Sequence, residues 1–75
     1  MGAGEKALAM RIAVNGKPAA VPAGSTVQTL LEQLRLDSRQ VVVERNQAIV
    51  PRQRFAEEVL AEDDTLEIVH FVGGG

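Results

Sequence analysis

One segment of the chain has the apolar spacing of an amphipathic helix, and this limits the folds that are open to it. Large apolar side chains recur there at positions i, i+3, i+4 and i+7: Val27, Leu30, Leu31 and Leu34. This spacing places them on one helical face, which must be buried against another element. We predict a helix over residues 26–35, with Ser25 as its N-cap and Gln28 as the partner in a capping box. The remainder of the chain then has to supply a sheet for this face.

The segment before this helix has the pattern of a β-hairpin. Residues 10–14 alternate large apolar side chains with others, which is typical of a half-buried strand. Asn15-Gly16 follows and favours a type I′ turn, since both central residues of that turn need a positive φ. Residues 17–21 then form the returning strand. Pro18 has no N–H for a ladder, so this strand is predicted at a sheet edge.

Two more strands are predicted directly after the helix. Residues 41–43 are three valines, whose β-branched side chains suit a central strand. Residues 48–50 form a short strand that Pro51 ends. Between them, Asn46 is suited to a left-handed turn position.

The last part of the chain predicts one helical turn or irregular segment around Phe55, Val59 and Leu60, followed by a final strand. Phe55 is expected to point inward from the turn, and residues 62–64 form a tight polar turn. The final strand covers residues 65–72. By alternation one of its faces carries Leu66 and Ile68, and the other carries Glu67, Val69 and Phe71.

The order strand, strand, helix, strand, short strand, strand indicates an α+β protein. We expect the first and last strands to be parallel neighbours, because a terminal strand without a partner would leave an exposed edge. A mixed sheet of four to five strands packed on one α-helix is the pattern of the β-grasp, or ubiquitin-like, roll. Residues 10–72 would form this domain, between a flexible N-terminal extension (residues 1–9) and a flexible glycine tail (residues 73–75).

Composition excludes several classes of function. The 75 residues suffice for one small domain, and a net charge of −2 gives no basic surface for nucleic acid. No apolar stretch approaches the roughly 20 residues that cross a bilayer. Residues 1–9 also lack the apolar region of a signal peptide. We therefore expect a cytoplasmic protein that binds neither nucleic acid nor membrane.

The chain offers little for catalysis. It contains no cysteine and a single histidine, His70, which has no companions at metal-ligand or catalytic-triad spacing. We expect no catalytic residue, no metal and no permanently bound cofactor, and we expect His70 to be a partly buried or edge residue without chemistry. The protein is predicted to be acted on by enzymes rather than to be one.

The final residues, Gly73, Gly74 and Gly75, have no side chains to pack and are expected to form a flexible tail. Fully extended, three residues span roughly 10 Å, enough to reach into a narrow enzyme channel. A frayed end or an expression remnant would explain the same composition. The residues before the tail decide between these interpretations.

Three blocks of sequence resemble the ThiS family, the sulfur carriers of thiamine biosynthesis. They are MRIAVNG at residues 10–16, VERNQAIVPR at residues 43–52 and DTLEIVHFVGGG at residues 64–75. The resemblance implies that an E1-like adenylating enzyme of the ThiF type uses ATP to adenylate Gly75. It further implies conversion of this residue to a thiocarboxylate, which delivers sulfur to a thiazole synthase of the ThiG type.

Apolar residues beside the tail are candidates for docking these enzymes: Ile49, Val69, Phe71 and Val72. A second cover or self-association would hide the same side chains. The acidic residues between 57 and 67 are expected to form a solvated face, with steering towards a basic partner as the weaker alternative. Arg52 and Arg54 are expected to pair with nearby acids at the surface.

Two other functions stay open from the sequence. The small sulfur-carrying subunit of molybdopterin synthase shares the fold and a Gly-Gly end, although the block from Asn46 to Arg52 favours the thiamine branch. A non-covalent β-grasp interaction module, in which the glycines have no role, is the alternative from a different class.

Overall fold

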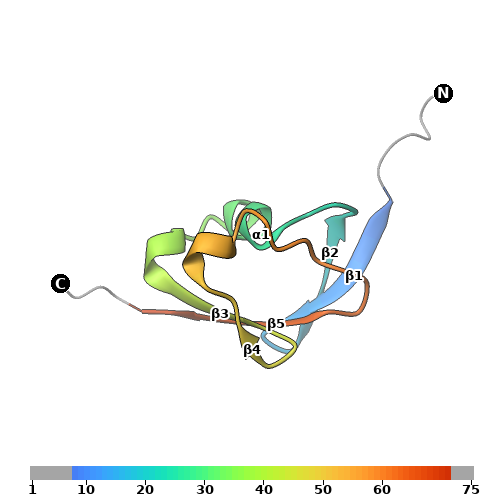
Figure 1. The fold of residues 1–75 in the computed structure, drawn as a ribbon. Coiled ribbons are helices and arrows are strands. Elements are labelled where there is room, and N and C mark those ends of the chain that lie inside the picture. Colours follow the sequence, from blue (N-terminus) through green and yellow to red (C-terminus); the bar gives the residue numbers. More distant parts are fainter. Residues whose placement is uncertain (1–7, 72–75) are drawn as a thin grey trace.

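The computed structural model describes residues 8–71, which form one mixed sheet and one α-helix. The strands are β1 (Ala9–Val14), β2 (Lys17–Pro22), β3 (Val41–Arg45), β4 (Ala48–Ile49) and β5 (Thr65–His70), in the spatial order β2-β1-β5-β3-β4 (Figure 1). The predicted fold class and element order are confirmed, with five strands. The predicted tail and most of the predicted N-terminal extension lie outside the described residues.

The first hairpin forms as its turn residues predict. Asn15 and Gly16 have φ values of 51° and 83°, the left-handed conformation that a two-residue turn requires. The turn pairs Val14 with Lys17 and sets the register of β1 and β2. β2 is an edge strand, so Pro18 leaves no ladder hydrogen bond unmade.

The helix α1 (Val27–Gln33) begins one residue later than predicted, and the N-cap is Thr26 rather than Ser25. The Thr26 hydroxyl accepts from the Thr29 backbone N–H at 3.1 Å, and the Thr29 hydroxyl accepts from the Thr26 N–H at 2.8 Å. The predicted capping box of Ser25 and Gln28 is therefore wrong. The Ser25 hydroxyl donates instead to the Pro22 carbonyl at 2.6 Å, because Ser25 lies in the buried turn that leads into the helix.

α1 packs its apolar face on one side of the sheet. Val27, Leu30 and Leu31 are almost fully buried, as predicted. Leu34 is only partly covered, because the helix ends at Gln33 and Leu34 is its C-cap. The core also takes side chains from every strand except β4, and these include Ile12, Val21, Val43, Leu66 and Ile68.

β5 lies at the centre of the sheet between β1 and β3. It runs parallel to β1 and antiparallel to β3, which confirms the predicted pairing of the first and last strands. Two turn asparagines extend this pairing. The Asn15 side chain accepts from the Ile68 N–H at 2.7 Å and donates to the Ile68 carbonyl at 3.1 Å. The Asn46 side chain, whose residue has the predicted positive φ, accepts from the Thr65 N–H at 3.0 Å.

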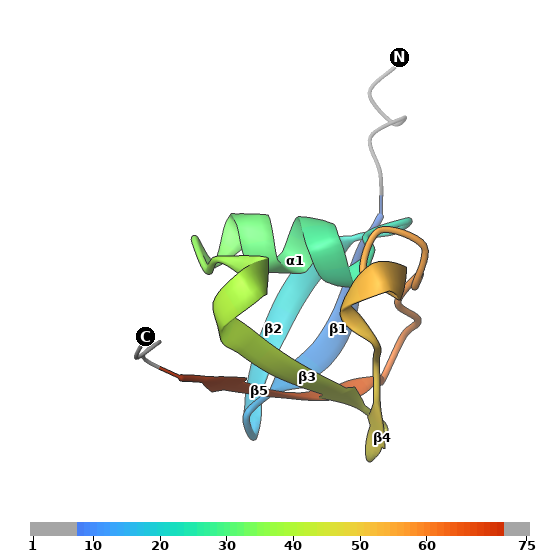
Figure 2. The same cartoon turned by 60° about the vertical axis from the view of Figure 1, so that its left-hand side comes forward.

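Two short 3-10 helices, η2 (Ser38–Gln40) and η3 (Arg52–Arg54), lie on the same side of the sheet as α1 (Figure 2). The helical turn lies earlier than predicted, as η3 before Phe55, and the Phe55 side chain is buried in the core as expected. Both views show no element on the other side of the sheet (Figures 1 and 2). In the described part of the chain, the sheet is therefore covered on one face only.

Candidate functional site

The uncovered side of the sheet, which we call the open face, carries every second residue of the strands. In β5, Leu66 and Ile68 are buried under α1 while Glu67 and Val69 point the other way. This is the division of faces that the sequence predicts. In β3, Val42 and Glu44 share the open face with them, because they lie directly opposite Val69 and Glu67.

Four exposed apolar side chains lie on the open face, and we call them the apolar patch. Their exposed fractions are 40% for Val42, 65% for Ile49, 61% for Val69 and 41% for Phe71. Ile49 belongs to this face because it lies opposite Glu44, and Phe71 because it alternates with Val69. Exposed apolar groups that are contiguous on one face are typical of a protein interaction site.

The apolar patch reaches the end of the described chain. The Phe71 N–H donates to the Gln40 carbonyl at 2.9 Å, so the pairing of β5 with the β3 side of the sheet continues past His70. Of the residues predicted as sites, Ile49, Val69 and Phe71 are therefore brought onto one face. Val72, Gly73, Gly74 and Gly75 lie outside the described residues, directly after the patch in sequence.

Val42 belongs to the apolar patch, and the sequence analysis missed it. The run Val41-Val42-Val43 has no alternation that would separate a buried from an exposed position. Only the pairing of Val42 with Val69 shows that the middle valine faces outward. The same pairing also places Glu44 beside the patch.

Of the acidic residues expected on a solvated face, four are exposed (Glu57, Glu62, Asp63 and Glu67), whereas Glu58 is half-buried and Asp64 is buried. Asp64 is only 6% exposed and accepts hydrogen bonds from Arg45 Nε at 2.8 Å, Asn46 Nδ2 at 3.0 Å and the Ala61 N–H at 2.7 Å. Arg45 also pairs with Glu58 at 2.9 Å. The local cause is the turn into β5, which brings Asp64 against the start of the β3–β4 connection.

Burial by itself would raise the pKa of Asp64, but its hydrogen bonds outweigh it. Donation from Asn46, from the Ala61 N–H and from Arg45 holds the pKa of this carboxyl below 3.8. The hydrogen bond to Glu58 is the main cause that raises the pKa of Arg45. Asp64 and Glu58 are thus both hydrogen bonded to Arg45, which is typical of a structural network rather than of a catalytic acid or base.

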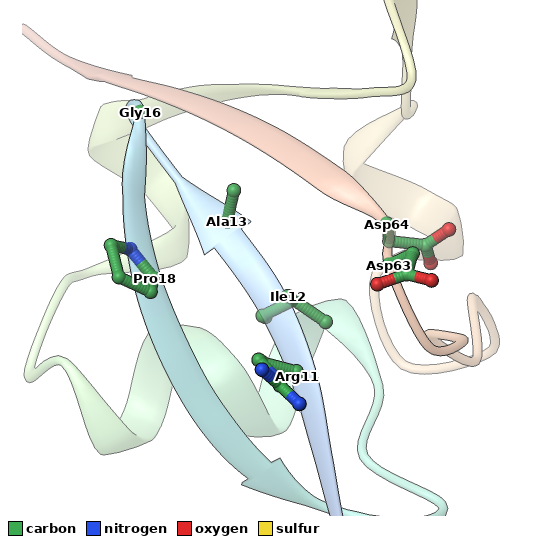
Figure 3. A pocket seen from close by; sticks show the side chains of 7 residues that line it. All are labelled: Arg11, Ile12, Ala13, Gly16, Pro18, Asp63 and Asp64. Atoms are coloured by element: carbon green, nitrogen blue, oxygen red, sulfur yellow. The ribbon is translucent and has the colours of Figure 1, made fainter.

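A shallow hollow of about 230 Å³ lies beside the β1–β2 hairpin (Figure 3). Figure 3 shows Arg11 and Pro18 on one side of it and Asp63 and Asp64 on the other. No residue of the apolar patch lines it. The Asp64 carboxylate is already hydrogen bonded, and the other charged side chains that line the hollow are Arg11 and Asp63.

The structure also places three surface residues of the sequence analysis: His70, Arg54 and Arg52. His70 is exposed at the end of β5, opposite Val41, and not partly buried. Arg54 lies 3.9 Å from Glu58, as expected for a weak surface pair. Within residues 8–71, Arg52 makes no ion pair with an acid, contrary to the prediction. Its Nε donates to the Ser38 carbonyl at 3.0 Å and so ties η3 to η2.

Within residues 8–71, no cluster of histidine and acidic side chains has the geometry to hold a metal ion. In the same part of the chain, no helix has the length and apolar character needed to cross a membrane.

Comparisons with known proteins agree with the resemblance. A model of the ThiS family matches residues 10–75. The sulfur carrier protein ThiS of Bacillus subtilis is 48% identical over 50 residues, which are 67% of this chain and 76% of that protein. The crystal structure of the thiamine biosynthesis protein ThiS from Geobacter metallireducens aligns with a TM-score of 0.75 at 33% identity, over 88% of this chain and 100% of that chain. The β-grasp fold is thereby confirmed.

A longer protein shows a similar match. A thiazole synthase of Magnetococcus marinus is 47% identical over 66 residues, which are 88% of this chain and 20% of that protein. The chain therefore spans about one fifth of the length of this relative.

Proposed function

The chain belongs to the ThiS family, and we propose that it is a sulfur carrier in thiamine biosynthesis, with the sulfur held on the carboxyl group of Gly75. The observation that carries the proposal is the family match, which includes the glycine segment as well as the domain. The apolar patch supports it, because the exposed face lies next in sequence to the segment that enzymes would handle.

The proposed chemistry takes place on the backbone and in partner enzymes. The Gly75 carboxylate attacks the α-phosphate of ATP, forming an acyl-adenylate and releasing pyrophosphate. A sulfur nucleophile at the oxidation level of sulfide then displaces AMP at the acyl carbon, which leaves a thiocarboxylate. Glycine suits this position because the nucleotide and the nucleophile must both approach the carbonyl closely. Transfer of the sulfur to the thiazole precursor, in exchange for an oxygen atom from that precursor or from water, regenerates the carboxylate.

We assign the partners from this chemistry. An adenylating enzyme of the ThiF type uses ATP to activate Gly75, and a thiazole synthase of the ThiG type accepts the sulfur; the match to a thiazole synthase supports the second assignment. The docking residues are Ile49, Val69, Phe71 and Val72, joined by Val42. The carrier itself is a cosubstrate and not an enzyme, and it acts in the cytoplasm.

The domain organisation is part of the proposal. The carrier domain extends to residue 72 and begins with β1 at Ala9, one residue before the predicted boundary, and residues 73–75 form its tail. In this arrangement the Gly75 carboxyl enters an enzyme channel while the domain stays outside.

The alternative of a molybdopterin synthase subunit has less support, since the family and the relatives reported above belong to thiamine biosynthesis. A purely non-covalent interaction module would use the open face but would have no need of the Gly75 carboxyl group. The two interpretations differ in whether this carboxyl group reacts.

Mass spectrometry tests the proposal. The protein is incubated with its adenylating enzyme, ATP and a sulfur donor, and the C-terminal peptide is sequenced. We expect replacement of one oxygen by sulfur, located on a peptide that ends at Gly75. An unchanged mass under conditions that modify the Bacillus subtilis relative would refute the carrier function.

A further inference from the structure

Two acidic side chains face each other on the open face, beside the apolar patch. Glu44 of β3 and Glu67 of β5 are directly opposite in the antiparallel register. Side chains in this position have Cβ atoms roughly 4.5–5.5 Å apart, and like charges placed there destabilise a sheet. Glu67 is exposed and Glu44 half-buried, so each carboxylate can still be reached from outside.

The part of the chain that the structure describes does not neutralise this pair. Neither carboxylate makes an ion pair or a side-chain hydrogen bond there, in contrast to Asp64 and Glu58. Arg11 is the basic residue at a strand position of the same face. It lies at the other end of β5, where its carbonyl accepts from the Asp63 N–H at 2.7 Å. Arg11 and Glu67 are thus separated by about four residues along β5, roughly 13 Å.

Apolar side chains border the carboxylate pair. Val42 and Val69 form the next outward-facing pair along the two strands, and Ile49 lies beside Glu44 on β4. A cation that reaches the two carboxylates would be surrounded by side chains that exclude water once a partner covers them. Charge-assisted hydrogen bonds contribute more in such a desolvated position than at an exposed one.

We propose that the open face binds thiazole synthase through one arginine of that enzyme, which inserts between Glu44 and Glu67 while Val42, Ile49 and Val69 pack around it. The planar guanidinium group has several N–H donors in a fixed fork and can therefore bond both carboxylates at once. This inference rests on the proposed function and adds the chemistry by which the partner is recognised.

A second copy of the chain is a poor occupant for this face. A two-fold axis through the apolar patch would bring the Glu44–Glu67 pairs of both copies together, with four carboxylates in a site from which water is excluded. A partner with a basic side chain removes the repulsion that already exists within the pair. The complementary charge therefore favours a different protein.

Binding measurements with the thiazole synthase from the same organism test the proposal. We expect Glu44→Gln and Glu67→Gln each to weaken binding about tenfold or more, as loss of a hydrogen bond between charged groups does. The double variant should lose only slightly more than either single variant, because both acids hold the same cation and their effects are not additive. Glu57→Gln is the matched control, since it removes the same charge from an exposed residue away from the open face, and it should bind as the unaltered protein does.

Thermal unfolding separates this role from a structural one. Relief of the like-charge contact should leave the Tm of Glu44→Gln and Glu67→Gln equal to or above that of the unaltered protein. Unchanged binding, equal weakening by Glu57→Gln, or strictly additive losses would each overturn the proposal. A defect confined to adenylation would also overturn it, by assigning the face to the adenylating enzyme. In all of these cases the thiocarboxylate test on the unaltered protein still decides the proposed function independently.

Discussion

At the scale of single residues, Asp64 shows how one carboxylate can connect separate segments. It accepts from a side chain of β3, from the turn residue Asn46 and from the backbone of Ala61. All three donors favour the ionised form, so the network depends on the charge of Asp64. No buried side-chain nitrogen or oxygen in the described residues lacks a hydrogen-bond partner.

We predict that Asp64→Asn lowers the free energy of unfolding at pH 7 by roughly 1.5–3 kcal/mol, because hydrogen bonds to a charged group are lost. The folded-state pKa of Asp64 is depressed, so its contribution is complete above the ordinary value of 3.8 and is lost as the pH falls through the lower folded value. The stability difference between the two proteins should therefore shrink in acid. Urea unfolding at pH 7 and at about pH 3 measures it, and a difference that is independent of pH would contradict the assignment.

At the scale of elements, α1 is short and depends on its cap and its buried face. It has seven residues, too few for a helix to be stable by itself in water. Its N-terminus is stabilised by the reciprocal hydrogen bonds of Thr26 and Thr29. The rest of the stabilisation of α1 comes from packing of its buried side chains on the sheet, namely Val27, Leu30 and Leu31.

Thr26→Ala should lower the free energy of unfolding by about 1 kcal/mol, the usual effect of losing an N-cap side chain. Gln28→Ala is the matched control. Its side chain donates to Glu32 at 3.1 Å on the exposed side of the helix, so its removal should change stability by a few tenths of a kcal/mol at most. Equal effects of the two substitutions in chemical unfolding would argue against Thr26 as the cap.

Leu31→Ala tests the buried face of the same helix. Leu31 has no exposed surface, so we predict a loss of about 2–5 kcal/mol in the free energy of unfolding. Leu34→Ala should cost clearly less, because Leu34 is partly exposed at the C-cap. A thermal melt in which both variants behave alike would refute the assigned orientation of α1.

At the scale of the whole molecule, the core and the apolar patch lie on opposite sides of the sheet. The core is built between the sheet and α1 and does not use the open face. Stability and the proposed partner recognition would therefore depend on different side chains, and each could be altered separately.

We predict that removal of Gly75, or addition of one residue after it, abolishes thiocarboxylate formation and leaves the Tm unchanged. The reason is that the reacting carboxyl group is displaced while every side chain of the core is retained. The intact mass after activation measures thiocarboxylate formation, and calorimetry measures the Tm. A variant that still acquires sulfur, or a large fall in Tm, would contradict the assignment of Gly75.

The patterns of single segments were sufficient to predict the fold class, the Asn15-Gly16 turn and the inward and outward faces of β5. These features depend on local spacing and on backbone preferences that are present in the sequence itself. The N-cap was misplaced by one residue because Ser25 and Thr26 have equally suitable side chains. Which one caps the helix depends on where the preceding turn lets the helix begin.

Only the tertiary structure decided how separate segments pair. The register of β3 against β5 brings Val42 into the apolar patch and sets Glu44 opposite Glu67, and neither fact can be read from a run of three valines. The same applies to Asp64, which lies in an acidic stretch of sequence yet is buried by residues distant from it along the chain. Local periodicity shows which side chains share a face, whereas long-range pairing determines which neighbours they meet there.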